Sequence, residues 1–416
     1  MDLRVNGARL REKIADLATI GATSEGGTTR LALTIEEWSA KKWIINELRS
    51  VGLEVTIDKI TNVFGRRNGT RSDARPILFG SHIDTVVNGG RFDGAYGLIA
   101  SLEVMRVLYE ARIETIHPLE LACFTGEEAA RYPTLFGSSV VSGLRTLENA
   151  YSTEDQEGIS ARQAIIQLGL QPDSLADPLK NHDYGEAFVE LHIEQGPILE
   201  REQVQIGVVE NIAGYDQIFL KIFGQADHAG TTPMSDRKDP MLATALLTID
   251  VNRLAKESGP NGRGTVGIVR TTPGVVNIIP NTVEVSIDLR EVDPNRLQKL
   301  IEKVMSCLET RCKELQLTYE IDESTSIPVT TLSKRIQDTI VASAKDLGLN
   351  YKMMNSGAGH DAECMARVAD TGMIFVPSRE GRSHSPLEFT DWKDLENGAN
   401  VLLNTILNLS NEQVFR

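Results

Sequence analysis

The sequence is poor in cysteine and in long apolar runs, and each shortage excludes a class of protein. Four Cys residues among 416, none of them in a C-x-x-C pair, are too few for a disulfide scaffold. No segment approaches the ~18 uninterrupted apolar residues of a membrane helix. The first residues, M-D-L-R-V-N-G-A-R-L-R-E-K, are charged where a signal peptide would be apolar. We therefore expect a reduced, cytoplasmic location and no membrane partner.

Basic residues are also in the minority. The chain has 43 Lys and Arg against 58 Asp and Glu, which gives a formal charge of −15. A surface this acidic repels phosphate, so we predict no nucleic-acid partner. Apolar residues make up 41%, and with 34 Gly the composition is close to the globular average. That composition excludes a disordered, collagenous or coiled-coil chain.

Helix and strand patterns alternate along the chain, which predicts an α/β fold with a central sheet flanked by helices. Strands are predicted at 53–60, 76–80, 119–125, 187–193 and 372–376, and helices at 35–51, 96–110, 332–347 and 392–409. Residues 213–328 read as a separate α+β block of two long helices and about four strands. We therefore predict a domain made of residues 1–212 and 329–416, into which a second domain, 213–328, is inserted.

The first polar constellation follows the predicted strand at 76–80. His82 ends the strand, and Asp84 lies two residues later on the same side, where it can accept the second imidazole N–H. Asp93 follows in a loop rich in glycine. These residue types suit a metal site, although a capped turn would also explain them.

Three further constellations have the same ambiguity. Glu127 and Glu128 are adjacent carboxylates after an apolar strand, which is costly without a cation or a proton but also common at a helix start. Alternation places His192 on one strand face with two glutamates, where a core histidine is the alternative. His384 stands in a loop after the strand at 372–376.

Together these constellations provide three histidines and two carboxylates, a ligand set that suits two divalent ions sharing a carboxylate. The set is His82, Asp93, Glu128, His192 and His384. The chain has no H-E-x-x-H, Walker or G-x-S-x-G motif, and S-G-A-G-H at 356–360 lacks the third glycine of a dinucleotide fingerprint.

In order and spacing these motifs resemble the di-metal aminoacylase and carboxypeptidase-like amidohydrolases. Within them they are most similar to the ureidohydrolase branch, which includes allantoate amidohydrolase and N-carbamoyl-L-amino acid hydrolase. The resemblance rests on G-S-H-I-D-T-V-x-N-G-G-x-x-D-G, E-E-x-x-R, F-G-S, E-L-H-I-E-Q-G, H-A-G-T-T-P-M, N-I-I-P, D-L-R, S-G-A-G-H-D and S-H-S-P, between residues 80 and 386. Nine such strings in order are highly specific.

The resemblance implies a di-metal peptidase-like catalytic domain with an inserted lid domain that dimerises. It assigns His82, Asp93 and His192 to one metal, and Asp93, Glu128 and His384 to the other. It makes Glu127 the general base and Asp84 the residue that orients His82. The metals would be zinc or manganese, with cobalt or nickel as further candidates, since imidazole and carboxylate ligands admit all four.

The resemblance also implies a set of substrate-binding residues: Gln195, Gln217, His228, Asn277, Arg290, Gly359 and His360. In the inserted block, Arg290 offers a planar fork for a carboxylate. Asn277 offers a donor and an acceptor, and His228 can hydrogen-bond a developing oxyanion. Read singly, these residues would be a surface salt bridge, a turn and a core histidine. His117 and His182 match no motif and are predicted to be structural.

The predicted activity is metal-dependent hydrolysis of a ureido C–N bond in a small carboxylate substrate, with release of ammonia and carbon dioxide. Allantoate is the first predicted substrate, an N-carbamoyl-L-amino acid the alternative, and a dipeptide less favoured. A homodimer with the active site completed across the interface is expected. A non-catalytic ligand-binding protein on the same fold is the alternative from another class, although every metal position and Glu127 are present.

Overall fold

The computed structural model describes residues 3–71 and 73–411 and divides the chain into two compact units. The first unit comprises the residues up to Glu210, Leu332–Met354 and the residues from Gly359 onward. The second comprises Asn211–Thr331 and Asn355–Ala358. Its long segment begins at 211 and ends at 331, where the sequence prediction has 213 and 328. The short segment at 355–358 lies in the part that the sequence prediction gives to the first domain.

The sheet of the first unit has the strand order β1-β2-β4-β3-β5-β15-β6, and it confirms the predicted α/β class with a central sheet. Strands β4, β3, β5 and β15 run parallel to one another, while β1, β2 and β6 are antiparallel to their neighbours. The bounds are β1 Glu54–Ile57, β2 Val63–Arg67, β3 Ile77–His82, β4 Leu119–Phe124, β5 Ala187–Ile193, β6 Ile206–Ile212 and β15 Asp370–Val376. In addition, β14 (Tyr351–Ser356) and β13 (Thr330–Thr331) pair with β6.

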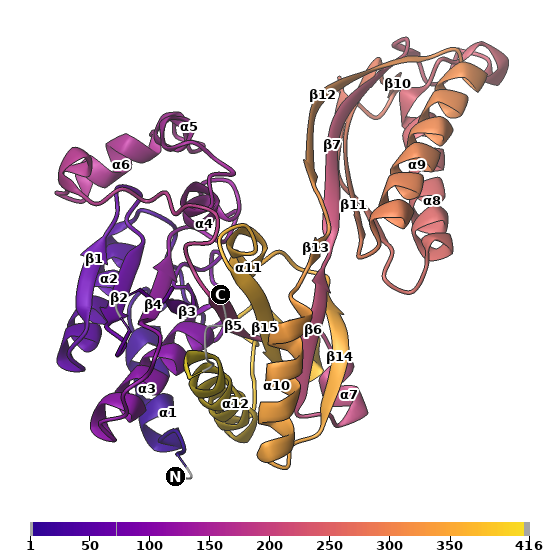
Figure 1. Ribbon diagram of the computed structural model, residues 1–416. Helices are drawn as coiled ribbons and strands as arrows, with labels where there is room; N and C mark the ends of the chain where they lie inside the picture. The colour runs from indigo at the N-terminus through magenta and orange to yellow at the C-terminus, as the bar shows by residue number, and fades with distance from the viewer. Residues whose placement is uncertain (1–2, 72, 412–416) are drawn as a thin grey trace. The chain divides into compact units, whose positions relative to one another are not determined.

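The central strands are apolar because helices cover them. Every residue of β3, β4 and β5 is buried, as near-continuous apolar runs in a parallel sheet require. Four helices that pack on one another contact these strands directly or through a neighbour (Figure 1). They are α1 Gly7–Ala18, α3 Ala95–Glu110, α10 Lys334–Asp346 and α12 Trp392–Ser410. Their apolar stripes and the strands form one continuous core.

Helix α2 (Ile35–Ser50) packs on β1 and β2 and begins as the sequence predicts, with Thr34 accepting from the Glu37 N–H. The Glu37 carboxylate accepts from the Leu33 N–H rather than from Thr34, and it also pairs with the buried Lys41. The shorter elements of this unit are α4 Phe136–Val141, α5 Leu147–Ser152, α6 Ala161–Gln167, α7 Ile198–Glu202, α11 Asp361–Met365, η1 Pro172–Ser174 and η3 Arg379–Gly381.

The second unit is an antiparallel sheet with the order β12-β7-β11-β9 and two long helices packed on one of its faces. Strand β11 alternates between buried and half-buried residues, so its apolar side chains face the helices and Asp288 and Arg290 face away. The bounds are β7 Gly214–Phe223, α8 Pro240–Ser258, β9 Arg263–Thr272, β11 Thr282–Glu291, α9 Pro294–Glu314 and β12 Thr318–Ile327, with η2 Met234–Asp236 and a small pair of strands, β8 Asp227–His228 and β10 Ile278–Ile279.

Helix length and apolar character together decide whether a segment can span a bilayer. None of the helices in the described ranges has enough of both.

Candidate active site

The predicted metal ligands come from the carboxyl ends of neighbouring parallel strands. His82 is the last residue of β3, and His192 is the penultimate residue of β5. Glu128 follows β4, and His384 lies in the loop after β15. Because β4, β3, β5 and β15 are adjacent and parallel, these ends meet at one edge of the sheet, where ligand sites of α/β proteins form.

The structure brings these residues together in two groups that share Asp93. In the first, Asp93 Oδ1 lies 3.1 Å from His192 Nε2 and 3.7 Å from His82 Nε2. In the second, His384 Nε2 lies 3.3 Å from Asp93 Oδ2 and 3.4 Å from Glu128 Oε1. The ligand atoms within each group lie within 4.8 Å of one another. All five predicted ligands therefore share one neighbourhood, with one oxygen of Asp93 toward each group.

Glycine makes this close approach of the Asp93 loop possible. Gly94 has φ +59°, and a Cβ there would lie 2.4 Å from the His82 imidazole. Any larger residue would both strain the backbone and push the loop away from His82. The loop then runs directly into helix α3.

Hydrogen bonds to backbone carbonyl oxygens fix the orientation of two histidines. His82 Nδ1 lies 3.1 Å from the Asp84 main-chain oxygen, and His192 Nδ1 lies 2.9 Å from that of Ile193. His192 Nε2 lies 3.1 Å from both the Gly94 backbone nitrogen and Asp93 Oδ1, so this nitrogen points toward the other predicted ligands. Each imidazole thus presents Nε2 for a ligand bond.

The side chain of Asp84 has a different role from the one predicted. Its Oδ1 lies 3.6 Å from His82 Nδ1, too far for a hydrogen bond. Its two oxygens instead accept from the backbone N–H groups of Glu127 and Glu128, each at 3.1 Å. The acceptor for His82 is the Asp84 carbonyl, so the carboxylate positions the Glu127–Glu128 turn.

Burial and the crowding of carboxylates shift the pKa values of this cluster. Burial, with Glu128, Asp361 and Asp84, holds the pKa of Glu127 well above its usual range. Burial and the neighbouring Asp93 carboxylate raise the pKa of Glu128 to about 8. Burial disfavours the charged form of His82, but the surrounding carboxylates outweigh it and hold the pKa of His82 well above the ordinary value.

The donor set fits two divalent ions. His82 Nε2 is buried and has no hydrogen-bond partner among the described residues, which is costly for a polar atom unless a ligand engages it. Three imidazoles and two carboxylates suit borderline ions such as zinc or manganese, and the shared Asp93 suits a pair of them. The residues do not select one metal.

A third group, Glu190, His192 and His360, also satisfies the spacing of metal ligands. Glu190 accepts from the Ser81 hydroxyl and the Ala362 N–H, at 2.7 and 2.8 Å. Because Nδ1 of His192 faces the Ile193 carbonyl, only Nε2 can face a cation, and the first group already uses it. Burial and His192 hold the pKa of His360 well below its ordinary value, which favours the neutral form of this imidazole.

Gln195 and Gly359 are further predicted substrate residues in the first unit. The Gln195 amide donates to Asp93 Oδ2 at 2.7 Å, so Gln195 directly contacts the shared carboxylate. Its Oε1 is buried and has no hydrogen-bond partner among the described residues. Gly359 lies where an added Cβ would approach the Glu363 carboxylate to 3.2 Å, immediately before His360.

The second unit holds the other predicted substrate residues in two pairs. His228 and Asn277 are exposed and adjacent, since His228 pairs with Ile278 between β8 and β10. His228 Nδ1 accepts from the N–H groups of Gly230 and Thr231, which leaves Nε2 to carry the proton of the neutral ring.

Gln217 and Arg290 form the other pair, around Asp288. The Arg290 Nε and Nη2 donate to the two Asp288 oxygens at 2.8 and 3.2 Å, and Gln217 donates to Asp288 Oδ2 at 2.9 Å. Arg290 Nη1 donates to the Gly357 carbonyl. One edge of the guanidinium is therefore held by the chain's own carboxylate, a partner that the sequence prediction did not name.

Comparison with known proteins identifies the class first. Residues 78–408 match the sequence profile of Peptidase family M20/M25/M40, and the chain belongs to that family. It is an amidohydrolase of this family, as the motifs predict.

Several relatives match over nearly the whole chain, and they include enzymes named for ureido substrates. An N-carbamoyl-L-amino-acid amidohydrolase of Paenarthrobacter aurescens is 37% identical over 95% of this chain and 96% of its own. An allantoate amidohydrolase of Bacillus subtilis is 35% identical over 95% of both. A hydantoinase/carbamoylase family amidase of Burkholderia multivorans has a TM-score of 0.89 at 35% identity, with both chains covered completely.

Proposed function

We propose that this protein hydrolyses the ureido C–N bond of a small carboxylate substrate. Water adds to the ureido carbonyl, the bond to the substrate nitrogen breaks, and the released carbamate decomposes to ammonia and carbon dioxide. The observation that supports this proposal is the pair of histidine–carboxylate groups around Asp93, with Glu127 Oε2 only 3.8 Å from His82 Nε2. In this proposal Glu127 is the base, and it lies beside residues that would hold two cations.

Two divalent ions bound by these groups would lower the pKa of water and polarise the substrate carbonyl. Glu127 accepts the proton of the attacking water and delivers it to the leaving nitrogen.

The remaining groups bind the substrate. His228 donates its Nε2 proton to the oxygen of the tetrahedral intermediate. Gln195 offers a buried oxygen with no described partner to an N–H of the ureido group. Arg290, oriented by Asp288, binds the substrate carboxylate, and Asn277 hydrogen-bonds it. Binding energy from a carboxylate remote from the reacting carbon then serves to position the ureido group.

We also propose that the protein is a homodimer in which one copy supplies His228 and Asn277 to the centre of the other. Helix α8 exposes Met241, Leu242 and Ile249, and its neighbour β9 is an edge strand of the sheet. An exposed apolar helix face beside an unpaired strand edge is a surface that pairs with a second copy of itself.

Mixing two inactive variants tests the dimer. If each active site needs Glu127 from one chain and His228 from the other, refolded mixtures of Glu127→Gln and His228→Ala recover activity. Random pairing gives about half mixed dimers, each with one intact site of two, so about a quarter of the wild-type activity is expected. No recovery, with dimers shown by ultracentrifugation, would place both residues in one chain's site.

Ammonia release from a substrate panel tests the reaction. Metal-free protein is supplied with manganese or zinc and assayed on allantoate, several N-carbamoyl-L-amino acids, N-carbamoyl-β-alanine, ureidoglycolate and a dipeptide. We expect turnover only with a ureido carboxylate and an added ion. The sequence motifs favour allantoate, whereas the relatives named as N-carbamoyl-L-amino acid enzymes include identities of 37% and 38% against 35% for an allantoate enzyme. Turnover of the dipeptide alone would refute the proposal.

A further inference from the structure

Glu388 is a buried carboxylate that touches the proposed metal centre without being one of its ligands. It lies in the loop that follows β15, four residues after His384, and is only 4% exposed. Its Oε1 accepts from the N–H groups of Phe92 and Asp93, at 2.8 and 3.2 Å. Its Oε2 accepts from the Ser383 hydroxyl at 2.8 Å. The Glu388 side chain thus accepts hydrogen bonds both from the backbone of Asp93, the residue shared by the two groups, and from Ser383, which precedes His384.

Ser383 extends the link to the Asp93 side chain. Its hydroxyl oxygen lies 2.8 Å from Asp93 Oδ2, the oxygen that faces the second group of ligands. Gln195 contacts the same oxygen at 2.7 Å. Glu388 and its hydrogen-bond partner therefore contact Asp93 from both the backbone and the carboxylate side.

Gly90 leaves room for the Glu388 carboxyl group. A Cβ at Gly90 would lie 2.0 Å from Glu388 Cδ, although the backbone of Gly90 needs no special conformation. The second glycine of the G-G pair in this loop is thus explained by packing against Glu388 rather than by a turn.

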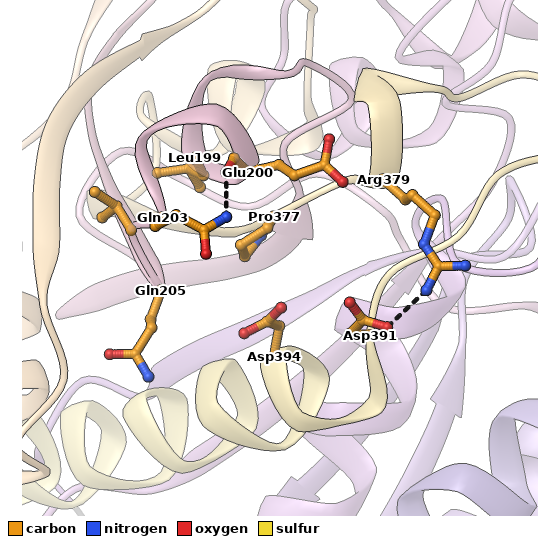
Figure 2. A pocket seen from close by; sticks show the side chains of 9 residues that line it. Leu199, Glu200, Gln203, Gln205, Pro377, Arg379, Asp391 and Asp394 are labelled. Carbon is orange, nitrogen blue, oxygen red and sulfur yellow. Dashed lines mark hydrogen bonds and ion pairs between the residues drawn. The ribbon is translucent and has the colours of Figure 1, made fainter.

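The loop that carries Ser383, His384 and Glu388 is closed at its base. Arg379 Nη2 donates to Asp391 Oδ1 at 2.8 Å (Figure 2). The Arg379 backbone N–H donates to the Phe389 carbonyl. Between these ends, the contacts of Glu388 tie the loop to the Asp93 loop, almost 300 residues away in the sequence.

The two groups of ligands depend on this tie to different degrees. His82 and His192 stand on central strands, which the sheet holds in place. Asp93 and His384 both stand on loops, and the second group contains both. Loosening one loop from the other displaces the second group more than the first.

We propose that Glu388 is a positioning residue that holds the Asp93 and His384 loops together for the second cation. The inference rests on the proposed two-ion centre. Outer groups that orient metal ligands typically contribute about 10–100-fold to metal affinity when they are removed. For Glu388→Ala we expect the affinity for the second ion to fall by about that factor, with the first ion's affinity changed less than about threefold.

Calorimetric titration of metal-free protein with Mn²⁺ tests this expectation, because it measures binding without turnover. Glu388→Gln keeps an oxygen for the two amides and a polar group for Ser383, so it should stay within about threefold of wild type. Glu291→Ala is the matched control, since Glu291 is also buried and accepts from a backbone N–H and a serine, but in the second unit. It should bind both ions normally.

Activity gives a second reading. The Mn²⁺ concentration that half-activates Glu388→Ala should rise at least about tenfold, and saturating Mn²⁺ should bring kcat to within about threefold of wild type. Loss of folding alone would give neither pattern. If circular dichroism shows that Glu388→Ala does not fold, Gly90→Ala serves in its place, because its added methyl group displaces the same carboxyl group from the opposite side. The affinity of Gly90→Ala for the second ion must then fall.

The inference is overturned if the affinity for both ions is unchanged in Glu388→Ala or, where that variant does not fold, in Gly90→Ala. An equal fall in the affinity for both ions would also overturn it. Failure of the proposed function has a different signature, because wild-type protein would then bind no pair of ions at all.

Discussion

The two units carry the proposed chemistry in opposite environments. In the first, His82 and His192 are 1% exposed, stand on central strands and converge on one carboxylate. In the second, His228 and Asn277 lie exposed on short connections, and Arg290 is bound to Asp288. The first set is buried, and hydrogen bonds to backbone carbonyls orient both imidazoles. The second offers donors with no wall around them, which is the physical reason to propose that a second copy supplies the rest of the site.

The largest expected effect comes from a substitution in the first unit alone. Glu127→Gln should lower kcat by about 10³-fold or more, because the amide cannot take a proton from water. The number of bound ions, measured by mass spectrometry of the metal, should remain at the wild-type value, since Glu127 is proposed as base and not as ligand. Glu128→Gln should instead lose an ion. A Glu127→Gln protein that loses its ions would exchange the two assignments.

An intermediate effect is expected from the exposed histidine of the second unit. His228→Ala should lower kcat by about 10²-fold, the typical cost of removing one oxyanion donor, without changing metal content. His182→Ala is the control, because His182 is 82% exposed in the first unit and has no proposed role. If both variants keep wild-type kcat, the second unit is not part of the chemistry.

A smaller effect separates binding from chemistry. Arg290→Lys should raise KM about tenfold with kcat nearly unchanged, since a lysine cannot bind Asp288 and the substrate carboxylate with one planar fork. Arg253→Lys, an exposed arginine of the same unit paired with Asp250, should leave KM unchanged. A fall in kcat alone would assign Arg290 to transition-state stabilisation.

The smallest expected effect is on stability. It compares how the melting temperature depends on pH when one buried carboxylate in each unit is replaced. Burial, partly offset by hydrogen bonds from Asn62 and Ile60, raises the pKa of Asp58 to about 7. A carboxyl group whose pKa is higher in the folded state than in the unfolded state stabilises the fold fully at pH values below its unfolded-state pKa. This contribution to stability is lost as the pH rises toward about 7, the pKa of Asp58 in the folded state. Asp58→Asn should therefore match wild type at pH 5.5 and melt about 2–4 °C higher at pH 8.5 by scanning calorimetry.

Asp250 should behave in the opposite way. Burial alone would raise its pKa, but hydrogen bonds from Arg311 and Arg253 hold the pKa of Asp250 below the usual value. Its contribution to stability is present above the pKa of the unfolded chain and is lost as pH falls. Asp250→Asn should lower the melting temperature at pH 8.5 more than at low pH, and the same direction for both variants would contradict the contrast.

The sequence allowed much of this description to be predicted because local patterns carried it. The strand at 187–193 and the helix at 96–110 follow from apolar periodicity, and the structure has β5 and α3 within one residue of those bounds. The five predicted ligands could be grouped from the sequence because each lies at or after the carboxyl end of a strand, and parallel strands end at one edge of the sheet. Strands β2, β6 and β14 were not predicted. Strand β6 pairs with strands that come more than 100 residues later in the chain, which a local pattern does not indicate.

Long-range partners explain the other omissions. Nothing in the sequence indicated the role of Glu388 beyond its place just after S-H-S-P, because two of its partners are backbone N–H groups almost 300 residues away. The fork of Arg290 was expected to face a substrate, and its partner Asp288 lies on the same strand face two residues earlier, a pairing that the period-2 pattern could have indicated.

Residue types, their order and the apolar periods thus determined by themselves the α/β class, the inserted block and the chemistry of the ligand set. Only the tertiary structure decided which oxygen of Asp93 faces which histidine, that the Asp84 carboxylate holds the Glu127–Glu128 turn, and that Glu388 joins two loops. The reason is that a sequence fixes which atoms can donate, accept or ligate, whereas distances between groups far apart in the chain exist only after the strands have paired.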